Sequence, residues 1–352
     1  SNSWVSECFL VDEPVTEVIK KIKPDIVVKG KEYDDQINPE LDVLKEYGGK
    51  LLFSSGEVVF SSVDLIKKDL SLTKERYNFP SNFLKRRNVN LKQMREAIER
   101  MSSLKVCVIG DLIVDEFVSC DPLGMSQEDP TIVVTPVDTS RFIGGAGIVA
   151  AHASGLGASV DFFSITGKDS TRDFAIETLD KFGVNSFLEI DESRPTTLKR
   201  RYRSQGKTLL RVSKLHQGSI GAEIQSKLLK AIENNIKDYD LIIYSDFNYG
   251  CLPQDLVDKL TKLGFKRNIF QAADSQSSSQ TGDISRFKNM HLLTPTEHEA
   301  RTSLRNQEDG LVIISENLRK ISNAKNIILK LADEGVLLHF FDENIGEPVT
   351  DR

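Results

Sequence analysis

The sequence predicts an α/β protein of two lobes, each built on parallel strands. Short apolar runs alternate with longer amphipathic runs, which indicates strands separated by helices and hence a parallel sheet. This alternation stops once, in a charged and strand-poor stretch at residues 71–103, and resumes at Lys105. A chain of 352 residues is long enough for two domains, or for one large domain with an appendage.

The first lobe is expected at residues 4–70 and should alternate strand and helix from its start. Its predicted strands are Cys8–Val11, Ile26–Val28 and Lys50–Phe53, and its predicted helices are Val15–Lys21 and Pro39–Tyr47. We interpret residues 71–103 as a linker that contains one helix, Leu91–Met101. The charge run Lys85-Arg86-Arg87 within it is typical of a solvated surface rather than of a binding patch.

The second lobe is expected at residues 104–352, where the α/β rhythm resumes. The predicted strands are 105–110, 132–137, 159–165, 241–245, 268–273, 291–294, 326–331 and 335–341. The predicted helices are 145–155, 170–182, 221–236, 253–263, 297–303 and 314–322.

Composition excludes several classes of protein. A net charge of −6 and a pI near 5.6 argue against a surface that coats nucleic acid. The four cysteines lie far apart without a CxxC pair, which favours reduced thiols in the cytoplasm over a disulfide frame or a zinc site. No run approaches the roughly 18 apolar residues of a membrane span. We therefore expect a cytoplasmic protein with no nucleic-acid or membrane partner.

The most informative stretch is the glycine pair Gly144-Gly145. It follows the apolar, strand-like run Val106–Asp115 and precedes a run of small residues that favours a helix. Glycine lets backbone amides approach a ligand closely, because it has no Cβ atom. A helix that begins there would direct its unpaired N–H groups at sugar hydroxyls or phosphates.

This order of strand, aspartate-bearing loop, glycine pair and helix resembles the ribokinase-like (PfkB) carbohydrate kinases. Within that family it looks closest to the heptose 7-phosphate kinase domains of bifunctional ADP-heptose synthesis proteins. The resemblance implies a three-layer α/β/α domain with a small β lid. It also implies ATP as the phosphate donor, Mg²⁺ as cofactor and a phosphorylated sugar as acceptor.

The resemblance assigns the sugar-binding positions. Asp115 matches the second aspartate of a GDxxxD motif, which binds sugar hydroxyls, whereas Asp111 could instead cap a turn. Gly144, Gly145 and Asp246, the last in a segment like SDYxKG, complete the pocket.

A second motif supplies positive charge. Pro195–Tyr202 resembles the TxKxR strand, so Lys199 and Arg201 are expected to neutralise the phosphate of the sugar. For Arg200, binding and the charge of an exposed edge strand remain equal alternatives.

The resemblance also assigns a nucleotide site. Asp274 stands where the family shows a DPK-like segment, and Thr296 lies in a TPNxxE-like one. Glu299 of that segment is expected to organise Mg²⁺ around the phosphates. Lys330 and Gly335 match a TxGxxG-like turn that supports the nucleotide.

The chain departs from the family pattern at several positions. Ile148 and Thr296 replace asparagines, and Tyr249 and Gln276 replace lysines. The GAGD segment that carries the family's catalytic aspartate does not occur in these 352 residues. We therefore assign no catalytic residue, expect the C-terminal part of the kinase domain to be missing, and expect this polypeptide to be inactive.

The first lobe resembles part of a cytidylyltransferase-like domain. Lys29-Gly30 ends a predicted strand in a PDxxVKGxxY-like segment, and Ser61-Ser62 resembles the Ser/Thr pair that opens the family's last helix. Alone, these serines could be ordinary helix caps. The family's HxGH motif is absent, since no histidine precedes His152. CTP or ATP would be the nucleotide of such a domain.

Together these features predict a kinase of a heptose-phosphate-like sugar joined to a sugar-phosphate nucleotidyltransferase, for nucleotide-sugar synthesis. The order of the two lobes reverses that of the familiar heptose fusion. Three alternatives stay open: a kinase of another sugar or nucleoside, a decayed sugar- or nucleotide-binding module, and a structural dimer through the lid sheets. A homodimer is expected.

Overall fold

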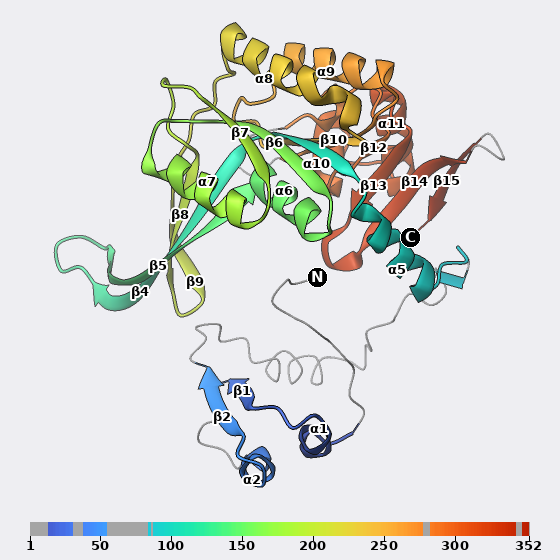
Figure 1. Ribbon diagram of the computed structural model, residues 1–352. Helices are drawn as coiled ribbons and strands as arrows, with labels where there is room; N and C mark the ends of the chain where they lie inside the picture. The colour runs from blue at the N-terminus through green and yellow to red at the C-terminus, as the bar shows by residue number, and fades with distance from the viewer. Residues whose placement is uncertain are drawn as a thin grey trace. The chain divides into compact units, whose positions relative to one another are not determined.

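The computed structural model describes residues 13–30, 38–54, 84–85, 87–276, 282–342 and 347–351 (Figure 1). Its contacts divide the chain into two compact units. One comprises residues 1–81 with 203–209, and the other comprises 82–202 with 210–352. The division falls inside the stretch that we expected to be a linker. The predicted helix there is confirmed as α5 (Leu91–Met101) and belongs to the second unit.

The first unit holds a two-stranded parallel sheet within its described residues. The elements are α1 (Val15–Ile22), β1 (Ile26–Gly30), α2 (Glu40–Lys45) and β2 (Lys50–Ser54). These confirm the predicted alternation, with α2 shorter than expected. The buried side chains of Ile19, Val43 and Leu44 hold the helices on the sheet. The predicted strand Cys8–Val11 lies outside the described residues.

The second unit is built on a sheet of nine described strands in the order β15-β14-β13-β12-β11-β10-β3-β6-β7. The strands that match predictions are β3 (Lys105–Gly110), β6 (Ser159–Thr166), β10 (Leu241–Asp246), β11 (Phe270–Ser275), β12 (Leu292–Leu293), β13 (Asn326–Lys330) and β14 (Val336–Asp342). Two others, β7 (Asn185–Ile190) and β15 (Glu347–Asp351), were not predicted.

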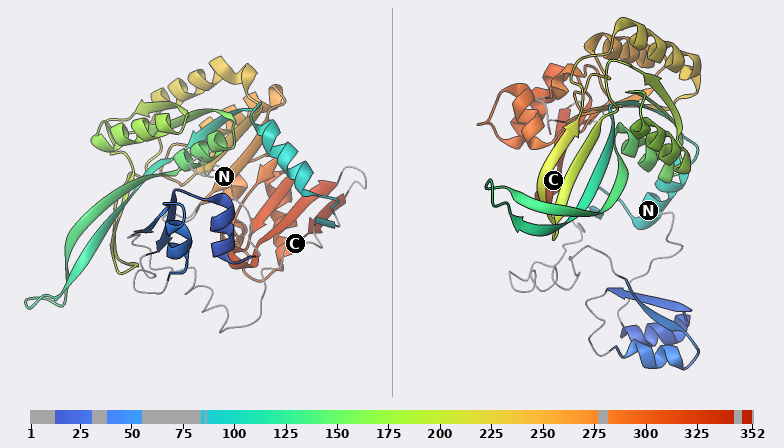
Figure 2. Two further views of the ribbon diagram at one scale, coloured as in Figure 1. Left: turned by 60° about the horizontal axis from the view of Figure 1, so that its bottom comes forward. Right: turned by 90° about the vertical axis from the view of Figure 1, so that its left-hand side faces the viewer.

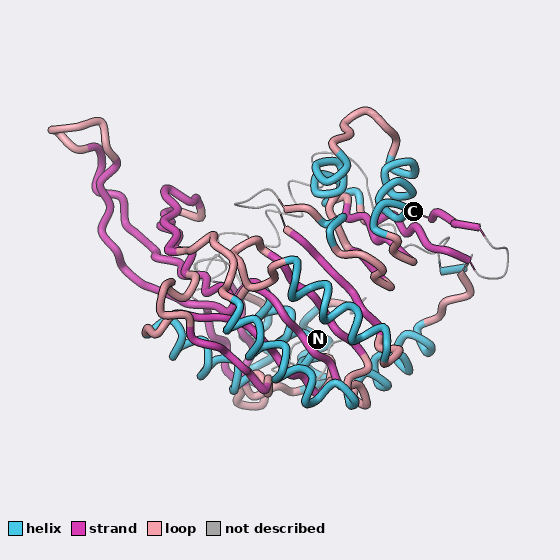
Figure 3. Tube along the Cα trace, turned by 90° about the horizontal axis from the view of Figure 1, so that it is seen from above, coloured by secondary structure: helices cyan, strands magenta, loops and turns pink. Residues whose placement is uncertain are grey.

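Helices cover both faces of this sheet, and all six predicted ones are present. They are α6 (Ala146–Gly155), α7 (Ser170–Lys181), α8 (Ala222–Asn235), α9 (Gln254–Lys266), α10 (Glu297–Leu304) and α11 (Leu311–Ser322). Successive residues of β3 serve opposite faces: Cys107 packs in the core with α8 and α9, and Val108 packs in the core with α6 and α7. The result is a three-layer α/β/α arrangement (Figures 1 and 3).

A second sheet, the lid, has the strand order β5-β4-β8-β9. Its strands are β4 (Leu112–Met125), β5 (Ile132–Gly145), β8 (Leu198–Ser204) and β9 (Lys207–Lys214). The antiparallel β4–β5 pair forms a long hairpin that projects from the α/β layers of its unit (Figure 2).

The lid corrects the expectation of an aspartate-bearing loop after β3. Only Asp111 separates β3 from β4, and Asp115 lies within β4. The reason is the alternation of burial along residues 114–120. Val114, Glu116, Val118 and Cys120 are buried and Asp115, Phe117 and Ser119 are half-buried, so each face of one continuous strand carries both apolar and acidic side chains. The predicted strand 132–137 likewise continues to Gly145.

One half-buried network fixes α11 to the edge of the main sheet. Glu316 on α11 accepts hydrogen bonds from Arg319 (2.7 Å) and from His339 Nε2 on β14 (2.9 Å). His339 Nδ1 lies 2.8 Å from the Thr350 hydroxyl on β15. The Arg319 hydrogen bond, opposed by burial and supported by His339 and Lys320, lowers the pKa of Glu316 to about 2.

We expect Glu316→Gln to lower the free energy of unfolding by about 2 kcal/mol at pH 7. The folded pKa lies below the unfolded one, so this stabilisation is present above about pH 4.5 and is lost as the pH falls towards 2. Urea unfolding at pH 7 and pH 3.5 measures it. Glu177→Gln, at an exposed pair with Lys181, is the control and should change little. An equal loss at both pH values would contradict the prediction.

Candidate functional site

The candidate site lies at the carboxyl ends of β3, β10 and β11, beside the lid. Asp111 follows β3, Asp246 ends β10, and Asp274 is the penultimate residue of β11. Because β10 pairs in parallel with both β3 and β11, these three carboxylates gather at one edge of the sheet. Ligands of open α/β sheets bind at such an edge.

Asp111 holds a loop in place. Its carboxylate accepts hydrogen bonds from the backbone amides of Phe247 (2.8 Å), Tyr249 (3.2 Å) and Cys251 (3.0 Å). Burial and the nearby charge of Asp246 raise the pKa of Asp111 to about 6, although the three amides act in the opposite direction. These contacts favour the turn-capping alternative, and its sugar contact stays a prediction.

Asp246 is also engaged by protein groups. Its carboxylate accepts hydrogen bonds from Arg286 (2.8 Å), from the Ser275 hydroxyl (2.8 Å) and from the Asn248 amide (3.1 Å). The side chain is buried. The structure places Asp246 near Asp111 and in an internal ion pair with Arg286. Its predicted role in sugar binding stays a prediction.

The glycine pair lies close to Asp111 and Asp115. A Cβ atom at Gly144 would contact the carboxylate of Asp115, so glycine is what allows this close approach. Gly145 has a φ of +59° and precedes α6, whose first amide, that of Ala146, donates to the Asp111 carbonyl at 2.9 Å. The predicted helix start is therefore present, with Asp115 next to it.

We expect Gly145→Ala to destabilise the second unit by about 3 kcal/mol, because the new Cβ adds strain at positive φ and would meet the Asp111 carbonyl and the side chain of Ile113. Thermal or urea unfolding measures the loss. Gly155→Ala is the matched control on the same helix, because a Cβ there meets nothing within 4 Å. A loss no larger than that of the control would contradict the assignment.

The lid carries two ion-pair sets on opposite faces. Asp115 accepts a hydrogen bond from Arg201, whose guanidinium also lies over the Phe117 ring. On the other face Glu116 accepts hydrogen bonds from Arg200 and Arg141. Burial would raise the pKa of Glu116, but the two arginines outweigh it and lower the pKa. Arg200 therefore has an internal partner, Glu116, and the choice between its two predicted roles stays open.

Lys199 is the least compensated charge of the site. Its side chain is 5% exposed, and within the described residues it has no carboxylate partner. The ammonium lies over the rings of Phe247 (5.6 Å) and Tyr249 (5.1 Å). The Tyr249 hydroxyl is buried without a hydrogen-bond partner in the structure. A buried cation in this state favours an anionic ligand.

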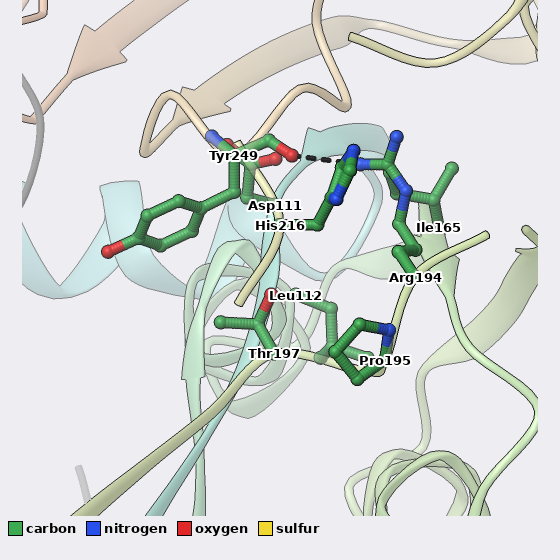
Figure 4. A pocket seen from close by; sticks show the side chains of 8 residues that line it. All are labelled: Asp111, Leu112, Ile165, Arg194, Pro195, Thr197, His216 and Tyr249. Atoms are coloured by element: carbon green, nitrogen blue, oxygen red, sulfur yellow. Dashed lines mark hydrogen bonds between the residues drawn. The ribbon is translucent and has the colours of Figure 1, made fainter. Parts of the chain in front are cut away.

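A small cavity adjoins this cluster (Figure 4). The residues that line it are Asp111, Leu112, Ile165, Arg194, Pro195, Thr197, His216 and Tyr249. Arg194 donates to the carbonyls of Tyr249 (3.0 Å) and Gly218 (2.9 Å), while the Tyr249 ring points away from it. Arg194 could not be predicted from the sequence, because its partners lie 24 and 55 positions away in the chain.

The predicted nucleotide residues form a second group at the same sheet edge. Lys330 at the end of β13 donates to Asp274 at 3.0 Å, and the Thr294 hydroxyl donates to the same oxygen at 3.2 Å. Gly335, with a φ of +95°, closes the turn between β13 and β14. Thr296 lies beside Lys330 through a parallel bridge.

Glu299 serves as part of a helix cap. Its carboxylate accepts a hydrogen bond from the Thr296 amide at 2.7 Å, and Thr296 caps α10 in return. No group of three or more His, Cys, Asp or Glu side chains in the described part of the chain could hold a metal ion. Any Mg²⁺ here would therefore take most of its oxygen ligands from nucleotide phosphates and water, as Mg²⁺ commonly does.

The structure describes two of the four residues predicted for the nucleotide site of the first unit, Lys29 and Gly30. Lys29 donates to Asn38 (2.8 Å) and to Glu40 (3.1 Å), and Gly30 ends β1. Ser61 and Ser62 lie outside the described residues.

Comparison with known proteins points to one family. A family model described as pfkB family carbohydrate kinase matches residues 103–344. The bifunctional protein HldE of Aliarcobacter butzleri is 29% identical over 246 residues, which cover 68% of this chain and 50% of that protein. The chain thus spans about half the length of the curated relatives it matches.

Solved structures show the same fold. Ribokinase from Giardia lamblia has a TM-score of 0.55 at 16% identity, covering 70% of this chain and 79% of that one. Phosphofructokinase-2 from Escherichia coli, in complex with fructose-6-phosphate, has a TM-score of 0.54 at 13% identity, covering 70% and 79%. The predicted ribokinase-like fold is confirmed. None of the described helices has the length and apolar character to cross a membrane.

Proposed function

Because this chain belongs to the pfkB family of carbohydrate kinases, we propose that it binds a sugar that already carries a phosphate, as the acceptor of a phosphoryl group from ATP. The observation that carries this proposal is Lys199, a buried ammonium whose described neighbours are aromatic rings rather than carboxylates. A phosphate would compensate that charge, and Arg201 on the same face of β8 would add a second donor.

The remaining predicted residues form two groups, one for the sugar and one for the nucleotide. Asp115 and the amides at the start of α6 would hold sugar hydroxyls, next to Gly144. Asp274, Thr296, Lys330 and Gly335 would support the nucleotide. Mg²⁺, when bound, would neutralise charge on its phosphates, with Glu299 available beside them.

A heptose phosphate is the sugar that we propose. The support is the HldE name shared by the curated relatives, together with the TxKxR-like strand that contains Lys199 and Arg201. We further propose that residues 4–70 derive from a sugar-phosphate nucleotidyltransferase that uses CTP or ATP. In that reading 71–103 links it to a kinase domain at 104–352, and Lys29, Gly30, Ser61 and Ser62 belong to its phosphate site. The parallel β1–β2 pair supports this.

A binding module without turnover is the second candidate. It is favoured by the carboxylates of the site, because Asp111, Asp115, Asp246 and Asp274 are all engaged by protein donors.

A homodimer through the lids is proposed as well. The lid strands expose large apolar side chains on the β4–β5 hairpin and along β9, namely Leu123, Met125, Ile132, Val133, Val137, Leu210 and Val212. Sedimentation equilibrium of the purified chain should give twice the monomer mass, and Val137→Lys should reduce it towards one. A monomer at all concentrations would contradict the proposal.

Isothermal titration with heptose 7-phosphate, fructose 6-phosphate and ribose tests the proposed function. We expect heptose 7-phosphate to bind most tightly and ribose least. Ribose binding as tight as that of the phosphorylated sugars would overturn the assignment. Titration with ATP and CTP tests the two nucleotide proposals separately.

A further inference from the structure

We propose that the Asp115–Arg201 ion pair is a latch that the phosphate of the substrate opens. In this proposal the phosphate draws Arg201 onto itself and thereby frees Asp115 to accept the sugar hydroxyls. It rests on the proposed function and deepens it, because it makes Arg201 the residue that selects phosphorylated over unphosphorylated sugar.

The latch is closed in the structure. Arg201 donates to one oxygen of Asp115. The other oxygen lies where the Cβ atom of a larger residue at position 144 would stand. A carboxylate in this state has little room for a hydroxyl. Both side chains are 24% exposed, so a ligand can reach the pair.

Arg201 is the member of the pair that can move. Asp115 has a short side chain on a strand that is paired along its whole length with β5. Arg201 has a long side chain that is otherwise held by contact with the Phe117 ring. Its guanidinium prefers phosphate in a two-pronged geometry, which a single carboxylate oxygen does not offer.

Lys199 marks where the phosphate would bind. It lies two residues before Arg201, on the same face of β8, at a spacing of about 6.6 Å along the strand. A phosphate between these two cations compensates the buried ammonium and gives Arg201 a stronger partner than Asp115. The exchange therefore replaces one charge-assisted hydrogen bond by several.

The opposite face of the lid provides a built-in comparison. Arg200 is held by Glu116, which is 1% exposed and shared with Arg141. A ligand that displaced Arg200 would leave the buried Glu116 carboxylate with Arg141 as its remaining partner, whereas Asp115 is partly exposed and would gain the sugar hydroxyls. Arg200 and Arg201 are neighbours on β8, but only Arg201 has a partner, Asp115, that a ligand can readily replace.

The latch predicts a positive coupling between phosphate and sugar hydroxyls, and linkage makes that coupling reciprocal. Isothermal titration of unphosphorylated heptose, with and without saturating inorganic phosphate, measures it. We expect phosphate to tighten heptose binding by about tenfold in the unmodified protein, within the range of typical couplings.

Two variants test whether Arg201 produces the coupling between phosphate and heptose binding. In Arg201→Met, heptose alone should bind about as tightly as it binds the unmodified protein with phosphate, and the effect of phosphate should fall below about twofold. Arg200→Met is the matched control and should keep the full coupling. Circular dichroism of each variant confirms that it is folded, and the measurement on the unmodified protein needs no variant.

Two results would overturn the latch while leaving the proposed function intact. One is tight heptose 7-phosphate binding with no effect of phosphate on heptose. The other is an equal effect of phosphate in Arg201→Met and the unmodified protein. Failure of heptose 7-phosphate to bind at all would instead remove the proposed function, and the latch with it.

Discussion

Lys199→Met is expected to weaken binding of heptose 7-phosphate by at least about 100-fold, since charge-assisted hydrogen bonds to phosphate are among the strongest single contacts of a site. The lysine is buried, and within the described residues it has no carboxylate partner. Methionine fills a similar volume between Phe247 and Tyr249 but carries no charge. ATP affinity should stay unchanged, because the predicted nucleotide residues lie on other strands.

The same substitution should raise the free energy of unfolding of the unliganded protein. Removing a buried charge that lacks a counter-charge relieves its desolvation cost, at the expense of ligand binding. Isothermal titration and urea unfolding measure the two effects. Lys214→Met, at an exposed position of β9, is the control and should change neither. Reduced stability with unchanged affinity would show that Lys199 has a structural role only.

The α/β frame could be predicted because its signals are local. Apolar runs such as Val106–Ile109 form strands, and the small-residue run after Gly145 forms α6. The lid strand β4 was missed for an equally physical reason. Asp111 and Asp115 were expected in a loop after the first strand. In the structure Asp115 and its neighbour Glu116 lie on opposite faces of β4, and each is paired with an arginine of β8.

The sequence predicted which residues lie at the site, but not their hydrogen-bond and ion-pair partners. Motif spacing indicated that Asp111, Asp246 and Asp274 follow strand ends, and parallel pairing brings them together. What each carboxylate binds depends on loops that are distant in the chain: Asp111 holds the loop after β10, and Asp246 holds Arg286. The aromatic faces over Lys199 are also long-range, because Phe247 and Tyr249 belong to that same loop.

This 352-residue polypeptide is expected to bind heptose 7-phosphate and ATP but to transfer the phosphoryl group at no detectable rate. Transfer to a hydroxyl needs a base within hydrogen-bond reach of its proton, and a positioned base contributes about 10²–10⁴-fold. The four described carboxylates of the site are committed to backbone amides, arginines and a lysine. The resembled family carries its base in a GAGD segment, and these residues contain none.

A radiolabelled transfer assay from ATP, run beside a ribokinase to set the detection limit, measures this expectation. Binding must be shown in the same preparation, so that a missing signal reports chemistry rather than a misfolded site. Robust transfer would contradict the prediction and show that another residue of the chain serves as the base. Asp115→Asn would then be the first variant to assay, because Asp115 is the carboxylate that a phosphate-bound Arg201 would release. If Asp115→Asn keeps full transfer, Asp111→Asn follows, since the raised pKa of Asp111, about 6, is near the range suited to a base.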